Sequence, residues 1–226
     1  MGARGCSTAG TWRCASLLAV LAAEGMRDGW LRTERFDWAK LGTDADGATY
    51  AGQVRARHVI CCEGAAVVRN PYFSWLPITP NQGEVLDVEC PGLSPDQVLN
   101  RGAYVVPVGP ERFRVGATYR WPPFTEGPTA VGREELAARL TVVTDLPFAV
   151  VGQRAGVRPA VRDRRPLLGP HPVVPSLSFC GGYGSKGVML APRLAVLLAD
   201  WLEDRAEIWP DVSLLRYNAL QPVGVS

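Results

Sequence analysis

Residues 179–200 combine a short apolar run, a glycine-rich turn and a long aliphatic stretch at helical spacing. Gly182, Gly184 and Gly187 match the pattern GxGxxG between a candidate strand and a candidate helix, the context of a dinucleotide-binding βαβ unit. Such a unit also needs a second parallel strand and an acidic ribose ligand about 20 residues further on. The residues after the helix, 201–226, offer no convincing buried strand. The segment therefore predicts a strand, a turn and a helix, without a βαβ dinucleotide site.

The start of this helix stays open. Pro192 suits a first helical turn, but it would kink a helix that begins at Gly187.

Length and charge narrow the classes of protein. The 226 residues are enough for one large domain or two small ones. Lys and Arg number 24 against 22 Asp and Glu, so no strong field would attract nucleic acid or an acidic membrane. The six cysteines have no CxxC spacing and Cys61 is followed by Cys62, which suits neither a metal site nor a secreted disulfide framework. We therefore expect a reducing, cytoplasmic setting, with no metal.

The N-terminal segment has two interpretations. Its apolar run at residues 14–23 resembles the core of a signal peptide. It also fits an amphipathic helix that is capped near Ser7, Thr8 or Thr11 and stops at Gly25. We favour the helix, because its cap and stop signals agree with each other. No run reaches the 18 or so apolar residues that a membrane span requires.

The first half of the chain contains signs of an α/β layer. Residues 30–40 show no clean period and are expected to be irregular or a short helix, and residues 44–47 form a turn between short strands. Residues 58–64 form a continuous apolar run that ends in glycine, which is typical of a strand buried in a parallel sheet. Three prolines within 71–80 then break regular structure, which predicts a crossing into another domain.

Beyond that crossing, the apolar period becomes two. Residues 82–90 alternate, and residues 104–108 and 112–117 read as a hairpin. Residues 129–143 have helical spacing, and residues 150–161 return to extended structure. An antiparallel sheet with a helix is the expected result.

Acid–base or nucleophilic motifs are missing from the sequence. His58 and His171 have no motif around them and are better explained as structural residues. The patterns GxSxG, HExxH and GxxxxGK[ST] do not occur. Chemistry in such a chain is expected to belong to a cofactor.

Several blocks of sequence resemble one family. They are CEG at 62–64, GVRPAVRDRRPLLG at 156–169 and GGYGSKGVMLAP at 181–192, with further similarity at 11–25 and in RVGAT at 114–118. Together they are similar to FAD-dependent oxidoreductases of the D-amino acid oxidase and glycine oxidase superfamily. The family's N-terminal βαβ unit, with its own GxGxxG, has no counterpart here, so we expect an N-terminally truncated member that retains FAD weakly or not at all.

The resemblance implies an α/β plus α+β fold. A remnant of a Rossmann-like FAD-binding domain, at residues 1–70 and 151–226, would be interleaved with an antiparallel-sheet substrate domain at residues 71–150.

It also implies site residues. Arg158 would pair with a substrate carboxylate, because a planar guanidinium grips a carboxylate with two hydrogen bonds, and Tyr104 would orient the substrate. The alternatives are an arginine fixed by a carboxylate of the protein and a half-buried sheet tyrosine. The expected flavin-binding residues are Gly64, Gly181, Gly182, Gly184, Ser185, Lys186 and Gly187. Residues 82–84 are weakly similar to a QGE-like or RGQ-like segment of the family near the flavin. The charged turn at 162–165 is expected to be solvated.

The implied activity is oxidation of a C–N bond in a small-molecule amine or amino acid, by hydride transfer to FAD. Two alternatives stay open: a non-catalytic binding protein or pseudo-enzyme, and a relative of tRNA-modifying flavoenzymes, which share a GS-[KR]-G turn. The near-neutral charge argues against the second. The oligomeric state, the amine and the electron acceptor stay open.

Overall fold

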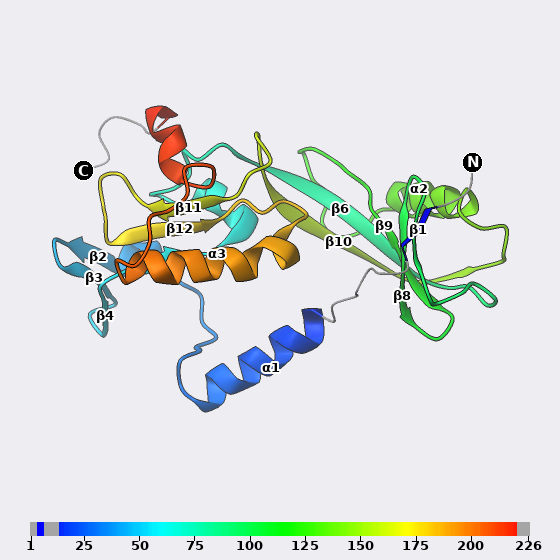
Figure 1. The fold of residues 1–226 in the computed structure, drawn as a ribbon, viewed down its shortest axis with the longest axis horizontal. Coiled ribbons are helices and arrows are strands. Elements are labelled where there is room, and N and C mark those ends of the chain that lie inside the picture. The colour runs from blue at the N-terminus through cyan, green and yellow to red at the C-terminus, as the bar shows by residue number, and fades with distance from the viewer. Residues whose placement is uncertain (1–3, 7–13, 221–226) are drawn as a thin grey trace. The chain divides into compact units, whose positions relative to one another are not determined.

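The computed structural model describes residues 4–6 and 14–220 (Figure 1). The chain divides into two compact units that are interleaved in sequence. Unit 1 comprises residues 1–11 and 80–158, and unit 2 comprises residues 12–79 and 159–226. The units thus change at 79/80 and 158/159, whereas the sequence suggested 70/71 and 150/151.

Unit 1 is built on a six-stranded sheet in the order β1-β7-β8-β9-β6-β10. Its elements are β1 (Arg4–Cys6), β6 (Ile78–Glu89), β7 (Val98–Asn100), β8 (Tyr104–Gly109), β9 (Arg112–Gly116), α2 (Ala130–Thr141) and β10 (Ala149–Val161). Strands β7, β8, β9 and β6 pair antiparallel in succession. The predicted antiparallel sheet and hairpin are confirmed.

One face of this sheet packs against α2. Leu86 and Val88 alternate along β6 and are buried against Leu136 and Leu140 of the helix. The helix begins where predicted, since the Thr129 side chain accepts a hydrogen bond from Gly132 N, as an N-cap residue does. Period two on the strand and period 3.6 on the helix bring these apolar side chains together.

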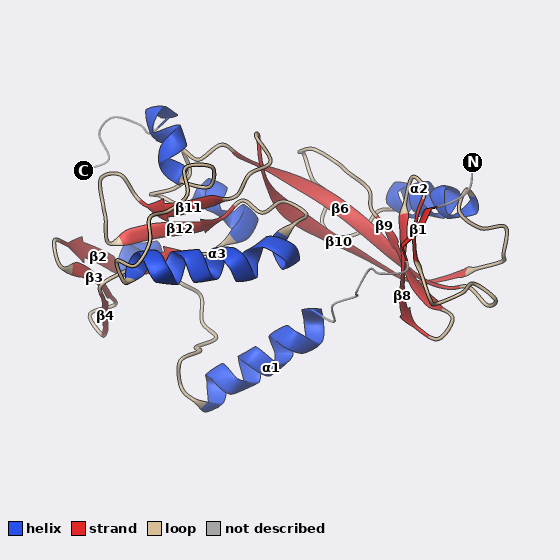
Figure 2. Cartoon of the chain, viewed as in Figure 1, coloured by secondary structure: helices blue, strands red, loops and turns tan. Residues whose placement is uncertain are grey.

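Unit 2 contains two three-stranded sheets, in the orders β11-β12-β5 and β2-β3-β4 (Figure 2). Its elements are α1 (Cys14–Arg27), η1 (Trp38–Lys40), β2 (Leu41–Asp44), β3 (Gly47–Tyr50), β4 (Val54–Ala56), β5 (Val59–Cys61), η2 (Gly64–Arg69), β11 (Leu167–Pro170), β12 (Leu177–Gly181), α3 (Gly187–Leu202) and η3 (Leu214–Leu220). Strand β5 runs parallel to β12, with Cys61 opposite Phe179. The predicted parallel strand is confirmed.

The β11-β12-β5 sheet has a core on each face. Phe179, Leu177 and Cys61 lie in one cluster with Phe73 and Val67. Their neighbours in the strands, Leu168 and Cys180, lie in the other cluster with Leu194, Leu197 and Leu198 of α3. Because side chains alternate along a strand, the continuous apolar run of β12 supplies both cores.

The structure corrects the predicted end of the first helix and settles the start of the last one. Gly25 was expected to end the first helix, but α1 continues to Arg27. Gly25 is buried there because the side chains of Trp30 and Leu31 occupy the space that a Cβ would need. Helix α3 begins at Gly187 and contains Pro192. The proposed caps Ser7, Thr8 and Thr11 lie outside the described residues.

The expected turns and irregular segments appear where predicted. Residues 30–37 are irregular and lead into η1, and β2 and β3 flank the turn at Asp44–Gly47. The turn at 162–165 is exposed, although Asp163 pairs with Arg216 and Arg165 pairs with Asp211. In the described part of the chain, no helix has the length and apolar character that crossing a bilayer requires.

Candidate active site

Arg158 lies on β10 and extends over the neighbouring strand β6 in unit 1. Its guanidinium occupies the space in which a side chain at Gly83 would begin. Nη1 donates a hydrogen bond to Oδ1 of Asn81 at 2.9 Å and a longer one to the Thr118 carbonyl at 3.4 Å. A glycine at 83 is therefore what lets the guanidinium lie flat on the sheet.

The partners of Arg158 are neutral. Within residues 4–6 and 14–220, no Asp or Glu forms a salt bridge with it, while Arg154 and Arg114 on the same sheet both pair with Asp87. The Tyr119 ring lies 5.8 Å from the guanidinium carbon, within the range of a cation–π contact. A protein carboxylate thus does not fix Arg158 in the described part of the chain, and its charge stays available.

Tyr104 lies on the same face of the sheet. It pairs with Gly116 of β9, which in turn pairs with Val85 of β6, and Val85 and Gly83 share a face because they are two residues apart. A side chain at Gly116 would collide with the Tyr104 hydroxyl. Burial raises the pKa of Tyr104, and the charges of Arg158 and Arg114 oppose that rise. The phenol therefore stays protonated at neutral pH and lies within the field of Arg158.

Two supporting residues were missed by sequence reasoning. Asn81 is fully buried, and its Nδ2 donates to the Arg120 carbonyl at 2.8 Å while its Oδ1 accepts from Arg158. Thr118 is also buried, and its Oγ1 accepts from Glu84 N at 2.9 Å. For Asn81, the available signal in the sequence is a polar residue directly before the 82–84 segment.

Glu84 lies on the opposite face of β6, beneath the start of α2. It is fully buried, and its carboxylate accepts hydrogen bonds from Thr129 N at 2.8 Å, Thr129 Oγ1 at 2.7 Å and Gln153 Nε2 at 2.7 Å. A Cβ at Gly132 would overlap this carboxyl group. The network fastens α2 to β6 and β10, the strands that carry Asn81 and Arg158.

The predicted cofactor residues gather at one edge of the unit 2 sheet. Gly64 follows β5, and the glycine turn follows β12. Because these two strands are parallel neighbours, their carboxyl ends meet at the same edge, where α/β sheets bind ligands. Gly184 N donates to the Pro159 carbonyl at 2.9 Å, which holds the turn against the end of β10.

The glycines of this edge are of two kinds. A Cβ at Gly181 would overlap Phe179 and one at Gly182 would overlap Val161, and Gly182 also has a positive φ of 73°, so packing and backbone conformation account for them. Gly64 and Gly184 have positive φ angles of 61° and 56°, yet a Cβ at either would meet nothing within 4 Å. Their backbone therefore faces open space. Ser185 and Lys186 are exposed beside them.

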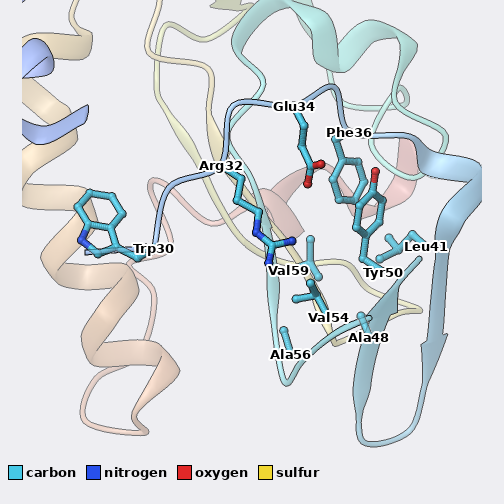
Figure 3. Close-up of a pocket in the computed structure, with 11 residues that line it drawn as sticks. Trp30, Arg32, Glu34, Phe36, Leu41, Ala48, Tyr50, Val54, Ala56 and Val59 are labelled. Atoms are coloured by element: carbon cyan, nitrogen blue, oxygen red, sulfur yellow. The ribbon is translucent and has the colours of Figure 1, made fainter. Parts of the chain in front are cut away.

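A separate cavity in unit 2 has a volume of about 440 Å³ (Figure 3). Phe36 and Tyr50 stack on one side of it with ring centroids 4.3 Å apart. Arg32 and Glu34 line it from the irregular segment before η1, and Val59 lines it from β5. None of the residues predicted to contact substrate or cofactor lines this cavity.

Neither histidine belongs to these sites. His171 is buried among Tyr72, Phe73 and Trp75, and its Nδ1 accepts hydrogen bonds from Val173 N and Val174 N. His58 is exposed and its ring meets the edge of Trp201.

The chain belongs to the family described as FAD dependent oxidoreductase, whose model matches residues 2–201. Glycine oxidase from Pseudomonas aeruginosa is 30% identical over 183 residues, which cover 78% of this chain and 50% of that protein. The chain spans about half the length of the curated glycine oxidases from Pseudomonas aeruginosa and Geobacillus kaustophilus that it matches.

Solved structures show the same fold. Glycine oxidase from Geobacillus kaustophilus superimposes with a TM-score of 0.68 at 27% identity, covering 81% of this chain and 52% of that one. Iminodiacetate oxidase from Chelativorans sp. BNC1 superimposes with a TM-score of 0.69 at 25% identity, covering 88% of this chain and 57% of that one. The predicted combination of a Rossmann-like FAD-binding fold with an antiparallel sheet is confirmed.

Proposed function

We propose that this chain supplies the carboxylate-binding site and part of the flavin site of an oxidase that acts on the C–N bond of a carboxylate-bearing amine. The observation that carries the proposal is Arg158, a half-buried cation whose hydrogen-bond partners are neutral. The named substrates of the two relatives, glycine and iminodiacetate, both carry a carboxylate beside an amine. Unit 1 would be the substrate domain and unit 2 the flavin-binding domain.

Arg158 binds the substrate carboxylate in this proposal. Its Nη1 is held by Asn81, so the guanidinium plane is fixed before the substrate arrives. A planar fork of donors forms two parallel hydrogen bonds with a carboxylate, which an ammonium group does not. Tyr104 lies on the same face of the sheet and donates a hydrogen bond to the substrate. Its raised pKa keeps the phenol protonated.

Gly64 and Gly184 would lie against the flavin ring, since their bare backbone faces open space at one sheet edge. The start of α3 adds N–H groups without intrahelical partners and a partial positive charge. The ammonium group of Lys186 adds a full positive charge. FAD, when bound, accepts a hydride from the carbon that carries the amine. The remaining work of the chain is to hold the substrate by its carboxylate and to orient it.

The cofactor assignment is tested by titrating the protein with FAD and following flavin fluorescence. Gly64→Ala and Gly184→Ala should each weaken binding at least tenfold, because a methyl group would enter the space that the ring needs. Gly52→Ala is the matched control: Gly52 has a φ of 67° and open surroundings in the β3–β4 turn, so it carries the same backbone strain away from this edge. Equal losses in all three variants would rule out the assignment.

The activity is tested by amine-dependent release of peroxide across a panel of amines, with FAD present. The panel is run on the 226-residue chain, and on a longer product if the gene extends upstream of Met1. Carboxylate-bearing amines should be oxidised and their decarboxylated counterparts should not. Binding of FAD and amino acid with no turnover would favour the alternative of a non-catalytic protein.

A further inference from the structure

Two thiols meet on the face of the unit 2 sheet that α3 covers. Cys61 pairs with Phe179 across the parallel strands β5 and β12, so the following residues, Cys62 and Cys180, are also cross-strand neighbours. Parallel strands lie about 4.8 Å apart, a separation within the Cα–Cα range that a disulfide spans. The thiols of Cys62 and Cys180 lie close enough that each shifts the pKa of the other.

A third group completes the cluster. The Tyr183 hydroxyl lies 2.9 Å from Cys180 Sγ. Contact with Cys62 and the hydrogen bond with Tyr183 together lower the pKa of Cys180 to about 7, against the effect of burial. The same contact raises the pKa of Cys62, and burial and Cys180 raise that of Tyr183. Of the two thiols, Cys180 therefore loses its proton more readily, and Cys62 and Tyr183 lie beside it.

The neighbouring cysteine is arranged differently. Cys61 points into the opposite core beside Phe179, because successive side chains alternate across a sheet. Burial raises the pKa of Cys61 to about 12, so it stays a thiol. The adjacent pair in the sequence is therefore divided between two faces, and only Cys62 can reach Cys180.

We infer that Cys62 and Cys180 form a redox-active dithiol that closes to a disulfide when it meets a peroxide. Cys62 is exposed and Cys180 keeps 8% of its surface accessible, so a small oxidant reaches the pair. This inference does not depend on the proposed oxidase activity.

The reaction balances in two steps. The Cys180 thiolate attacks one oxygen of hydrogen peroxide, the O–O bond breaks, and a sulfenic acid and hydroxide form. The Cys62 sulfur then attacks Cys180 sulfur, its proton leaves with the sulfenic oxygen as water, and the S–S bond closes. Two thiols lose two electrons, the peroxide gains them, and two waters result once the hydroxide takes up a proton.

The test treats the purified protein with one equivalent of hydrogen peroxide, blocks remaining thiols with iodoacetamide and maps peptides without reduction. We expect the loss of two thiols per chain and a cross-link between the peptides that contain residues 62 and 180. Because the link forms within one chain, the fraction of chains that carry it should not change when the protein is diluted at the same ratio of peroxide to protein. No loss of thiols, a Cys61–Cys62 link, or cross-links between chains would overturn the inference.

Variants separate the roles within the cluster. Cys61→Ser should retain the cross-link, which assigns the link to Cys62 although both cysteines lie in one peptide. Cys62→Ser should abolish it and leave a sulfenic acid on Cys180 that dimedone traps. Tyr183→Phe should slow the alkylation of Cys180 by iodoacetamide severalfold at pH 7, and an unchanged rate would remove Tyr183 from the cluster. Far-ultraviolet circular dichroism on each variant confirms that it is folded before thiols are counted.

Discussion

Asn81 accepts a hydrogen bond of 2.9 Å from Arg158, between the amide Oδ1 and the guanidinium Nη1. The amide is fully buried and is itself anchored to the Arg120 carbonyl. A neutral acceptor fixes the direction of the arginine without cancelling its charge. An aspartate in the same place would fix the direction and cancel the charge.

Arg158→Ala should raise the KM for a carboxylate-bearing amine between tenfold and about a hundredfold, since a charge-assisted hydrogen bond contributes about 1.5–3 kcal/mol. Arg154→Ala, on the same strand, is the control, because Arg154 already pairs with Asp87. The KM for a decarboxylated amine, if turnover is measurable, should not respond to either change. An unchanged KM in Arg158→Ala would place the carboxylate elsewhere.

Asn81→Asp should raise the KM for the same substrate at neutral pH, because the new carboxylate would pair with Arg158 and compete with the substrate. Asn81→Ala should affect the KM less and the stability more, since it removes the buried amide that donates to the Arg120 carbonyl and accepts from Arg158. Steady-state kinetics and urea unfolding on both variants separate the two effects. If both variants raise the KM equally, charge is not the cause.

Glu84→Ala should lower the free energy of unfolding by about 3 kcal/mol or more, because it removes the acceptor of three buried hydrogen bonds. Glu84→Gln should lose less, since its amide oxygen still serves Thr129 N and Gln153. Glu89→Ala is the control on the same strand: its pair with Arg112 is exposed and contributes at most about 1 kcal/mol. Urea unfolding measures all three, and similar losses at 84 and 89 would contradict the network.

His171 should make the protein less stable below about pH 6.5. Burial lowers the pKa of its ring, and protonation would put a proton on Nδ1, which accepts from Val173 N and Val174 N. Below the ordinary histidine pKa of about 6.5, the unfolded chain therefore binds a proton that the folded chain does not. The free energy of unfolding should fall as the pH falls through this range.

The measurement for His171 is the urea midpoint at pH 5, 6, 7 and 8. His171→Asn keeps an acceptor near Val173 and Val174 but does not titrate, so it should be less stable at pH 8 and show a weaker dependence on pH. A slope as steep as that of the unmodified protein would assign the effect to other groups.

Local features of the sequence predicted most of the elements. The alternation along 82–90, the hairpin at 104–117 and the helix after Thr129 follow from periods of two and 3.6 residues and from capping. The limit at Gly25 was wrong because a contact with Trp30 and Leu31, made after the helix ends, decides what that glycine does. A glycine in the sequence can either end a helix or allow close packing inside it, and the residue type alone does not tell which.

Contacts between side chains that are distant in the sequence could not be predicted from it. Asn81 and Arg158 lie on different strands, and Cys62 follows β5 whereas Cys180 lies on β12. No periodicity states which residues of two strands will face each other. Family resemblance indicated Arg158 but not the amide that holds it, and it gave no reason to connect two cysteines. The pairing of strands supplies this information.

The interleaving of the two units sets an order for folding. Apart from residues 1–11, unit 1 is one continuous segment, and its β8–β9 hairpin joins residues close in sequence. The parallel pairing of β5 with β12 instead closes a loop that contains all of residues 80–158. Such long-range parallel pairing is slow, and its entropic cost grows with the length of flexible chain enclosed. During synthesis the hairpin and α2 emerge before β12 exists, so a collapsed unit 1 shortens the loop that unit 2 must close.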